Sequence, residues 1–276
     1  MTLTSGSIFT AAEASVRQAL GPLRLPLPGE PFAVDEQPCT ISFDISDPCP
    51  PGDTAERALF RWLVGHHLSH CACRQLANVL ARLAGDEVDE KDVVEAADWY
   101  HRCTALLIYA NSCGEKVHRT VIRPSTMRVR PAFNGAGVRD YARVSRLLRE
   151  LPVERDSLLG CAVDTNRSAH EWIARILAPR GEPVLGAPGG AAGKGATSEE
   201  GDLLDSCFLV DRVPVTERGF AAQAVRRSEL ALFDLELDPI QRPEYAPLLA
   251  LLPDDITTVV HDMMLSFNLL GRGTPA

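Results

Sequence analysis

The sequence predicts a mainly α-helical fold, built as a single helical domain behind a proline-rich, irregular N-terminal arm. Three observations support this. Apolar residues recur at intervals of three and four along several long stretches, which is the spacing of one helix face. Few segments show the alternating pattern of a β-strand. Stretches rich in proline or glycine, residues 21–52 and 179–201, flank the helical parts and are typical of arms and linkers. We therefore place the arm at residues 1–52 and the domain at residues 53–276.

The longest predicted helix spans residues 54–83, with Asp53 or Thr54 suited to cap its first turn. It carries His66, His67 and His70, three of the chain's seven histidines. His66 and His70 are four residues apart and so share a helix face. An imidazole beside an apolar face needs a hydrogen-bond partner, a metal or a proton to transfer. Both a metal-binding pair and a polar stripe between packed helices are consistent with this pattern.

The remaining predicted elements are shorter. We expect helices at residues 8–20, 89–113, 140–150 and 164–177, and several helical segments within residues 202–276. Residues 39–46 resemble a short strand, and residues 115–141 fit an ordered loop or a string of short pieces, because prolines and glycines interrupt them. The stretch 179–201 contains GGAAGK, but no serine or threonine follows the lysine, so we interpret it as a linker and not as a phosphate-binding loop.

Composition restricts the partners of the chain. Its formal charge of -9 and pI of about 5.3 argue against a nucleic-acid partner and against an anionic membrane surface. The N-terminal residues lack the basic and apolar regions of a signal peptide, and no stretch has the 18 or so apolar residues of a membrane span. We therefore expect a cytoplasmic protein with small-molecule partners. The sequence leaves the oligomeric state open, with a homo-oligomer as one option.

Two carboxylate-x-x-His patterns suggest one kind of iron site. Asp98 precedes His101 by three residues, and Glu115 precedes His118 in the same way. A pair of Glu-x-x-His motifs is typical of di-iron helical bundles, which also need two further inward carboxylates. The sequence does not show where those carboxylates would come from, so a di-iron oxygenase is kept as an alternative.

His170 suggests another kind of iron site, in a heme. It lies in the predicted helix 164–177, about a hundred residues after the first histidine cluster. Histidines from two distant helices can approach a heme iron from its two sides. The alternative to an iron ligand is a histidine with a purely structural role in its helix.

The stretch 115–141 is rich in arginine, which is unusual in an acidic chain. Arg123 and Arg128 lie there together with Ser125 and Asn134. Guanidinium groups match carboxylates in shape and charge, so heme propionates and an amino-acid carboxylate are both candidates for binding. Surface pairing with the many acidic residues is the alternative.

Three stretches, HHLSHCACRQL, HRTVIRPSTMRVRPAFNGAGVRDY and NRSAHEW, together resemble the helical heme-dependent aromatic oxygenases, a superfamily that includes tryptophan 2,3-dioxygenase. In size and order the chain is most similar to the heme-dependent L-tyrosine hydroxylases of actinobacterial antibiotic pathways. The resemblance covers roughly residues 50–180, and residues 202–276 carry no recognisable signature. It implies a tryptophan 2,3-dioxygenase-like helical fold.

The resemblance also implies roles for individual residues. His170 would be the proximal ligand of the heme iron, and His67 or His66 the distal acid–base catalyst, with His67 preferred. Arg128 would contact the cofactor. Arg123, Ser125 and Asn134 would bind the substrate.

The activity implied is hydroxylation of L-tyrosine, or a close phenolic amino acid, at ring C3 to a catechol such as L-DOPA, with hydrogen peroxide as the oxidant. One relative attaches its heme through an H-x-x-x-C pattern; His67 and Cys71 have that spacing, but Ala174 stands at the matching position after His170. We therefore expect heme b without a covalent link. A tryptophan or indole oxygenase on the same scaffold, a di-iron oxygenase and a partner-binding helical protein remain the alternatives.

Overall fold

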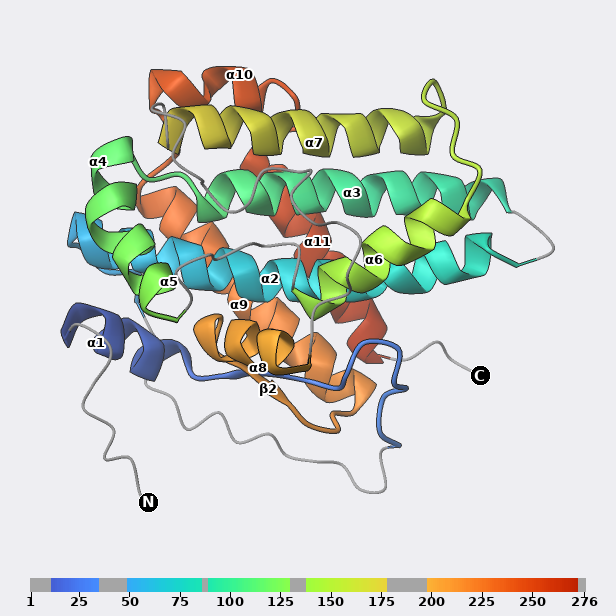
Figure 1. The fold of residues 1–276 in the computed structure, drawn as a ribbon, viewed down its shortest axis with the longest axis horizontal. Helices are drawn as coiled ribbons and strands as arrows, with labels where there is room; N and C mark the ends of the chain where they lie inside the picture. Colours follow the sequence, from blue (N-terminus) through green and yellow to red (C-terminus); the bar gives the residue numbers. More distant parts are fainter. Residues whose placement is uncertain (1–10, 35–48, 86–88, 130–137, 178–197, 273–276) are drawn as a thin grey trace.

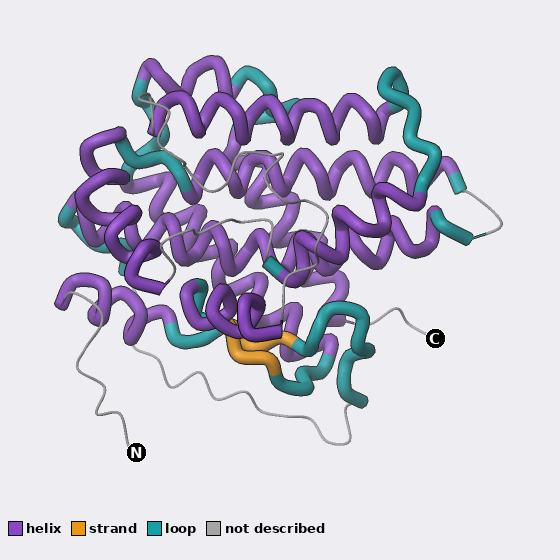
Figure 2. The backbone as a smooth tube through the Cα atoms, viewed as in Figure 1, coloured by secondary structure: helices purple, strands orange, loops and turns teal. Residues whose placement is uncertain are grey.

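The computed structural model describes residues 11–34, 49–85, 89–129, 138–177 and 198–272, without side-chain detail at 127–129, 198 and 272 (Figures 1 and 2). The predicted mainly helical fold class is confirmed. In the described part of the chain, strand structure is limited to two short segments. The elements follow in the order α1 (Ala11–Leu20), β1 (Leu23–Leu25), α2 (Thr54–Leu83), α3 (Glu90–Ala110), α4 (Glu115–Val117), the π-helix η1 (His118–Ile122), α5 (Arg123–Val129), α6 (Arg139–Glu150), α7 (Leu158–Leu177), α8 (Ser198–Cys207), β2 (Val210–Arg212), α9 (Glu217–Leu237), the 3₁₀-helix η3 (Pro243–Tyr245), α10 (Ala246–Leu249) and α11 (Ile256–Arg272).

Helix α2 is the central element, and its predicted bounds are confirmed. The Asp53 side chain accepts hydrogen bonds from the backbone N–H groups of Ala55 and Glu56, at 2.9 and 3.0 Å. This cap satisfies two of the amides that the start of a helix leaves without a partner. Helices α1, α3, α6 and α9 all pack against α2, so most of its side chains are buried.

Helices α2, α3 and α7 form successive layers (Figure 1), because α3 packs on α2 and α7 packs on α3. Helix α3 begins after the N-cap Asp89, close to the predicted start, and ends at Ala110, three residues early. Helix α7 begins six residues before the predicted Asp164. The earlier start has a local cause, since the Ser157 hydroxyl accepts a hydrogen bond from the Gly160 N–H at 3.1 Å and so caps the helix there.

The stretch after α3 is a string of short helical pieces, as one of the two predictions for residues 115–141 has it. Elements α4, η1 and α5 follow one another without a break. In η1 the Arg123 N–H bonds to the carbonyl of His118, five residues back. Pro124 follows and has no amide hydrogen for a regular ladder. Residues 130–137 lie outside the described residues.

A two-stranded parallel sheet joins the beginning of the chain to its second half. Strand β1 pairs with β2, with Leu23 opposite Val210 and Leu25 opposite Arg212. Leu23 and Leu25 are fully buried, so this part of the predicted arm is packed into the core. The sheet was missed from sequence because each strand has three residues. The predicted strand at 39–46 lies outside the described residues.

The second half of the chain is helical, as predicted for residues 202–276. Helices α9 and α11 pack against each other, and α9 also contacts α2. None of the described helices is long and apolar enough to cross a membrane. Of the linker predicted at residues 179–201, residues 179–197 lie outside the described residues, whereas residues 198–201 are helical and begin α8.

The crossing of α2 and α3 is tight at Gly65, next to the first histidine. A Cβ atom at Gly65 would lie 2.6 Å from the Cβ of Ala110 and 3.0 Å from its Cα. Because the contact is with backbone and a methyl group, Gly65→Val is expected to lower the free energy of unfolding by about 1–3 kcal/mol, measured by urea unfolding. Gly52→Ala is the control, since an added Cβ there meets no heavy atom within 4 Å. Equal stability of the two variants would contradict the close crossing.

Candidate functional site

His66 lies in the middle of α2 and is half-buried. Its Nδ1 lies 2.6 Å from the carbonyl oxygen of Trp62. An unprotonated nitrogen would repel that oxygen, so Nδ1 carries the proton and Nε2 keeps its lone pair. The ring stacks on Phe208, with centroids 4.3 Å apart. Burial lowers the pKa of His66 to about 4, despite the raising effect of the Trp62 hydrogen bond, so the imidazole is neutral at pH 7.

His67, the next residue, is fully buried and has both ring nitrogens occupied. Its Nε2 lies 2.6 Å from the carbonyl oxygen of Phe208, and its Nδ1 accepts a hydrogen bond from Nε of Arg227 at 2.9 Å. Burial and the charge of Arg227 hold the pKa of His67 well below its usual range. In this arrangement His67 links α2 to α9 and presents no free nitrogen to a ligand.

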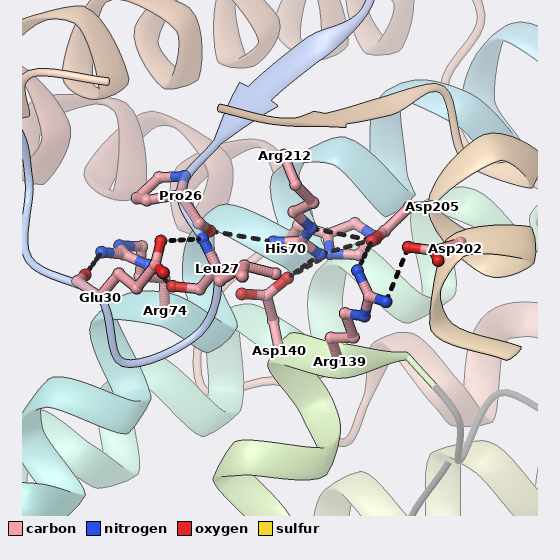
Figure 3. Close-up of polar contacts among 10 residues, drawn as sticks. All are labelled: Pro26, Leu27, Glu30, His70, Arg74, Arg139, Asp140, Asp202, Asp205 and Arg212. Atoms are coloured by element: carbon pink, nitrogen blue, oxygen red, sulfur yellow. Dashed lines mark hydrogen bonds and ion pairs between the residues drawn. The ribbon is translucent and has the colours of Figure 1, made fainter. Parts of the chain in front are cut away.

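His70 lies one turn after His66 and is 3% exposed. Its Nδ1 lies 2.7 Å from Oδ2 of Asp140, at the start of α6 (Figure 3). Its Nε2 is buried and has no hydrogen-bond partner among the described residues. A histidine that donates one N–H to a carboxylate and keeps the other nitrogen free is oriented in the way metal-bound histidines commonly are.

Asp140 also belongs to a chain of ion pairs (Figure 3). Nη2 of Arg212, at the end of β2, lies 2.7 Å from Oδ2 of Asp140 and 2.7 Å from Oδ1 of Asp205. Nη1 of Arg139 lies 3.0 Å from Oδ2 of Asp205. Burial alone would raise the pKa of Asp140, but the hydrogen bond from His70 and the charge of Arg212 outweigh it and lower this pKa to about 2. The carboxylate is therefore charged at pH 7 and fixes the ring of His70.

His170 lies on α7 with exposed side-chain surface. Burial nevertheless lowers its pKa to about 4. Both observations hold if solvent reaches the ring while protein surrounds it closely. The charge of a protonated His170 is the smallest of the causes that lower the pKa of His66.

The arginine-rich stretch is only partly described. Arg123 begins α5 and is half-buried. Ser125 is buried, and its hydroxyl oxygen lies 2.8 Å from Oε2 of Glu13 and 3.0 Å from the carbonyl oxygen of Val121, the two acceptors within reach of its single proton. The side chain of Arg128 and the whole of Asn134 lie outside the described residues. The roles of these four residues in binding therefore stay predictions.

The di-iron alternative is not supported by the described residues. Among them, no group of three or more histidine, cysteine, aspartate or glutamate side chains could hold a metal ion. Glu115 instead pairs with Arg119 at the surface, with 3.4 Å between Oε1 and Nη1. A heme iron differs in this respect, since the porphyrin supplies four ligands and the protein needs to supply one or two.

Sequence reasoning missed Asp140, Arg212 and Arg227. Asp140 stands in the first turn of a basic helix, where an acidic residue is ordinary. Arg212 and Arg227 lie in the part of the chain without recognised motifs. Only the ends of the network, the histidines, carried a signal, because an imidazole on an apolar face implies some partner without showing which residue it is.

The fold and the site define a helical protein whose central helix offers two oriented histidines, each with one ring nitrogen that no described residue occupies. Comparison with protein families makes this more specific: residues 4–160, more than half of the chain, match the model of the SfmD 3-methyl-L-tyrosine peroxygenase family. The chain therefore belongs to this family. No individual curated protein matches it significantly. The matched region contains His66, His70 and Asp140 but ends before His170.

Proposed function

We propose that the chain is a heme-dependent peroxygenase that forms a catechol from a tyrosine. It hydroxylates L-tyrosine at ring C3, or a close relative such as 3-methyl-L-tyrosine at the ring carbon next to the phenolic carbon that still carries a hydrogen. Family membership supports the peroxygenase class and a tyrosine-derived substrate. The observation that carries the proposal is His66, a neutral imidazole with Nδ1 bonded to its own helix and Nε2 free. The proposal includes a tryptophan 2,3-dioxygenase-like scaffold, a role in antibiotic biosynthesis and a cytoplasmic location.

Two histidines of the chain are available to hold and face a heme. His170 forms no hydrogen bond with a described residue and has free ring surface, so it can serve as the iron ligand. His66, on α2, is the second histidine that this proposal places beside the heme, and its Nδ1 is bonded to the Trp62 carbonyl. Cys71 is fully buried, and burial raises the pKa of its thiol to about 12. We accordingly keep the proposal of heme b without a covalent bond.

The distal role moves from His67 to His66 in this proposal. His67 was preferred from the sequence, but its two nitrogens are engaged by Phe208 and Arg227. His66 has one nitrogen to spare for a proton. His70 is a positioning residue, because its ring packs edge-on against Phe208, on which His66 also stacks.

Bound heme would supply activation of hydrogen peroxide for transfer of one oxygen atom to an aromatic ring. The overall change is balanced: the ring C–H becomes C–OH, and the second peroxide oxygen leaves as water. Nε2 of His66 accepts a proton from the peroxide and returns it to the departing oxygen. His66 is neutral at pH 7 and so has a lone pair for the proton, and its low pKa favours the return of that proton to the departing oxygen.

Two measurements test the proposal. The purified, heme-supplemented protein is expected to show the Soret absorption of a bound heme. With hydrogen peroxide it is expected to convert L-tyrosine or 3-methyl-L-tyrosine to a catechol, detected by mass spectrometry. A protein that binds no heme would refute the proposal, and one that oxidises tryptophan or indole but no phenol would favour the alternative activity.

A further inference from the structure

A cavity of about 330 Å³ lies between the N-terminal strap, residues 28–32, and helices α2 and α6. Its wall includes Arg74 and Asp140, and the aromatic ring of Phe32. This volume is within the range of small-molecule binding sites. The cavity adjoins the histidine network, because Asp140 is both part of its wall and the hydrogen-bond partner of His70.

The side chain of Arg74 is buried in the wall of this cavity and held there by several contacts. It is 7% exposed. Its Nη1 donates to the carbonyl of Leu27, just before the strap, at 3.4 Å, and its Nη2 donates to the strap carbonyl of Glu30 at 2.5 Å (Figure 3). Its guanidinium carbon lies 4.5 Å from the centroid of Phe32. The Nε of Arg74 is buried and has no hydrogen-bond partner among the described residues. A buried hydrogen-bond donor without an acceptor lowers the stability of the folded protein, so a ligand that accepts from Nε would be favoured.

Arg143 brings a second positive charge to the cavity wall. Its guanidinium lies against the backbone of Gly29, where an added Cβ would collide with Nη1, and where φ is +92°. Glycine is therefore required at this point of the strap. No described residue forms an ion pair with Arg143. Burial lowers the pKa of Arg74, the charge of Asp140 raises it, and the charges of Arg212 and Arg143 add to the lowering.

We propose that this cavity binds the carboxylate group of the aromatic amino-acid substrate, with Arg143 and Arg74 as its partners and Phe32 as an apolar wall. Two guanidinium groups with unused donors match the two oxygens of a carboxylate. Asp140 and Glu30 lie on the same wall and suit the ammonium group of an amino acid. The identity of the amino acid rests on the proposed function, whereas the carboxylate site rests on these contacts alone.

Calorimetric titration of the full-length, heme-supplemented protein with L-tyrosine and with tyramine, which lacks the carboxylate, tests this assignment. The wild-type protein is expected to bind L-tyrosine about tenfold to a hundredfold more tightly than tyramine, the range expected for hydrogen bonds to a charged group. Arg143→Met is expected to remove this difference by weakening L-tyrosine alone. Arg146→Met, an exposed arginine on the same helix, is the matched control and is expected to retain it.

Several outcomes would overturn the assignment. Unchanged discrimination in Arg143→Met would do so, as would loss of discrimination in Arg123→Met instead, which would favour the binding residues expected from the sequence. Binding of inorganic phosphate that depends on Arg143, without binding of L-tyrosine, would assign the cavity to another anion. If Arg143→Met does not fold, Arg143→Lys replaces it and is expected to show a partial loss.

The same titrations separate this inference from the proposed function. Suppose that the protein binds heme and forms a catechol, while Arg143→Met still prefers L-tyrosine to tyramine. This result would support the proposed function and refute the carboxylate site. If L-tyrosine binding depends on Arg143 but the protein binds no heme, the carboxylate site would be supported and the proposed function refuted.

Discussion

Asp140→Ala is expected to lower the free energy of unfolding by about 3–5 kcal/mol, the range for removing one member of a buried ion pair. Asp140 is 2% exposed and holds two partners, Nδ1 of His70 and the guanidinium of Arg212. Without the carboxylate, a buried imidazole N–H loses its acceptor and a largely buried arginine loses one of its two charge partners. Urea unfolding monitored by circular dichroism at pH 7 measures the change.

The matched control lies at the exposed end of the same chain of ion pairs. Asp202 bonds to Nη2 of Arg139 at 2.8 Å, but 69% of its side chain is exposed. Surface ion pairs contribute about 0–1 kcal/mol, so Asp202→Ala is expected to stay within that range. If Asp140→Ala proved no more costly than Asp202→Ala, the network around His70 would not be the structural junction inferred from the geometry.

The long helices could be predicted from sequence because their determinants are local. Asp53 and Asp89 cap α2 and α3 at the positions where the sequence places helix starts. The start of α7 was predicted six residues too late, since Asp164 is as good a cap by residue type as Ser157, and the chain uses Ser157. The sheet of β1 and β2 could not be predicted, because its stability comes from burial of Leu23 and Leu25 beneath elements from the far half of the chain.

The histidine site was predictable in outline. The i, i+4 spacing correctly indicated that His66 and His70 share a face, and both prove to be oriented by a single Nδ1 hydrogen bond. The choice between His66 and His67 depended on contacts from Phe208 and Arg227, which follow more than 140 residues later. No local pattern carries that information. The same holds for Asp140 and for the cavity beside it.

His66→Phe is expected to lower turnover by about 10²–10⁴-fold, the range for loss of a general acid–base group, while the protein still binds heme. Phenylalanine keeps a ring for stacking on Phe208 but has no Nε2 to accept a proton. Steady-state rates with hydrogen peroxide and a tyrosine substrate, together with the Soret spectrum, measure the two effects separately.

His170→Ala is expected to lose the heme or alter its spectrum, because it removes the proposed iron ligand.

The variant His67→Phe is the decisive comparison for His66→Phe. His67→Phe removes the acceptor of Arg227 and the donor to the Phe208 carbonyl, both buried. It is therefore expected to lower the free energy of unfolding by about 1–3 kcal/mol, while the folded fraction keeps the proton-transfer step. A stable His67→Phe protein without turnover, beside an active His66→Phe protein, would restore His67 as the distal residue. It would also mean that the Arg227 and Phe208 contacts rearrange when heme binds, since His67 cannot keep both hydrogen bonds and accept a proton from peroxide.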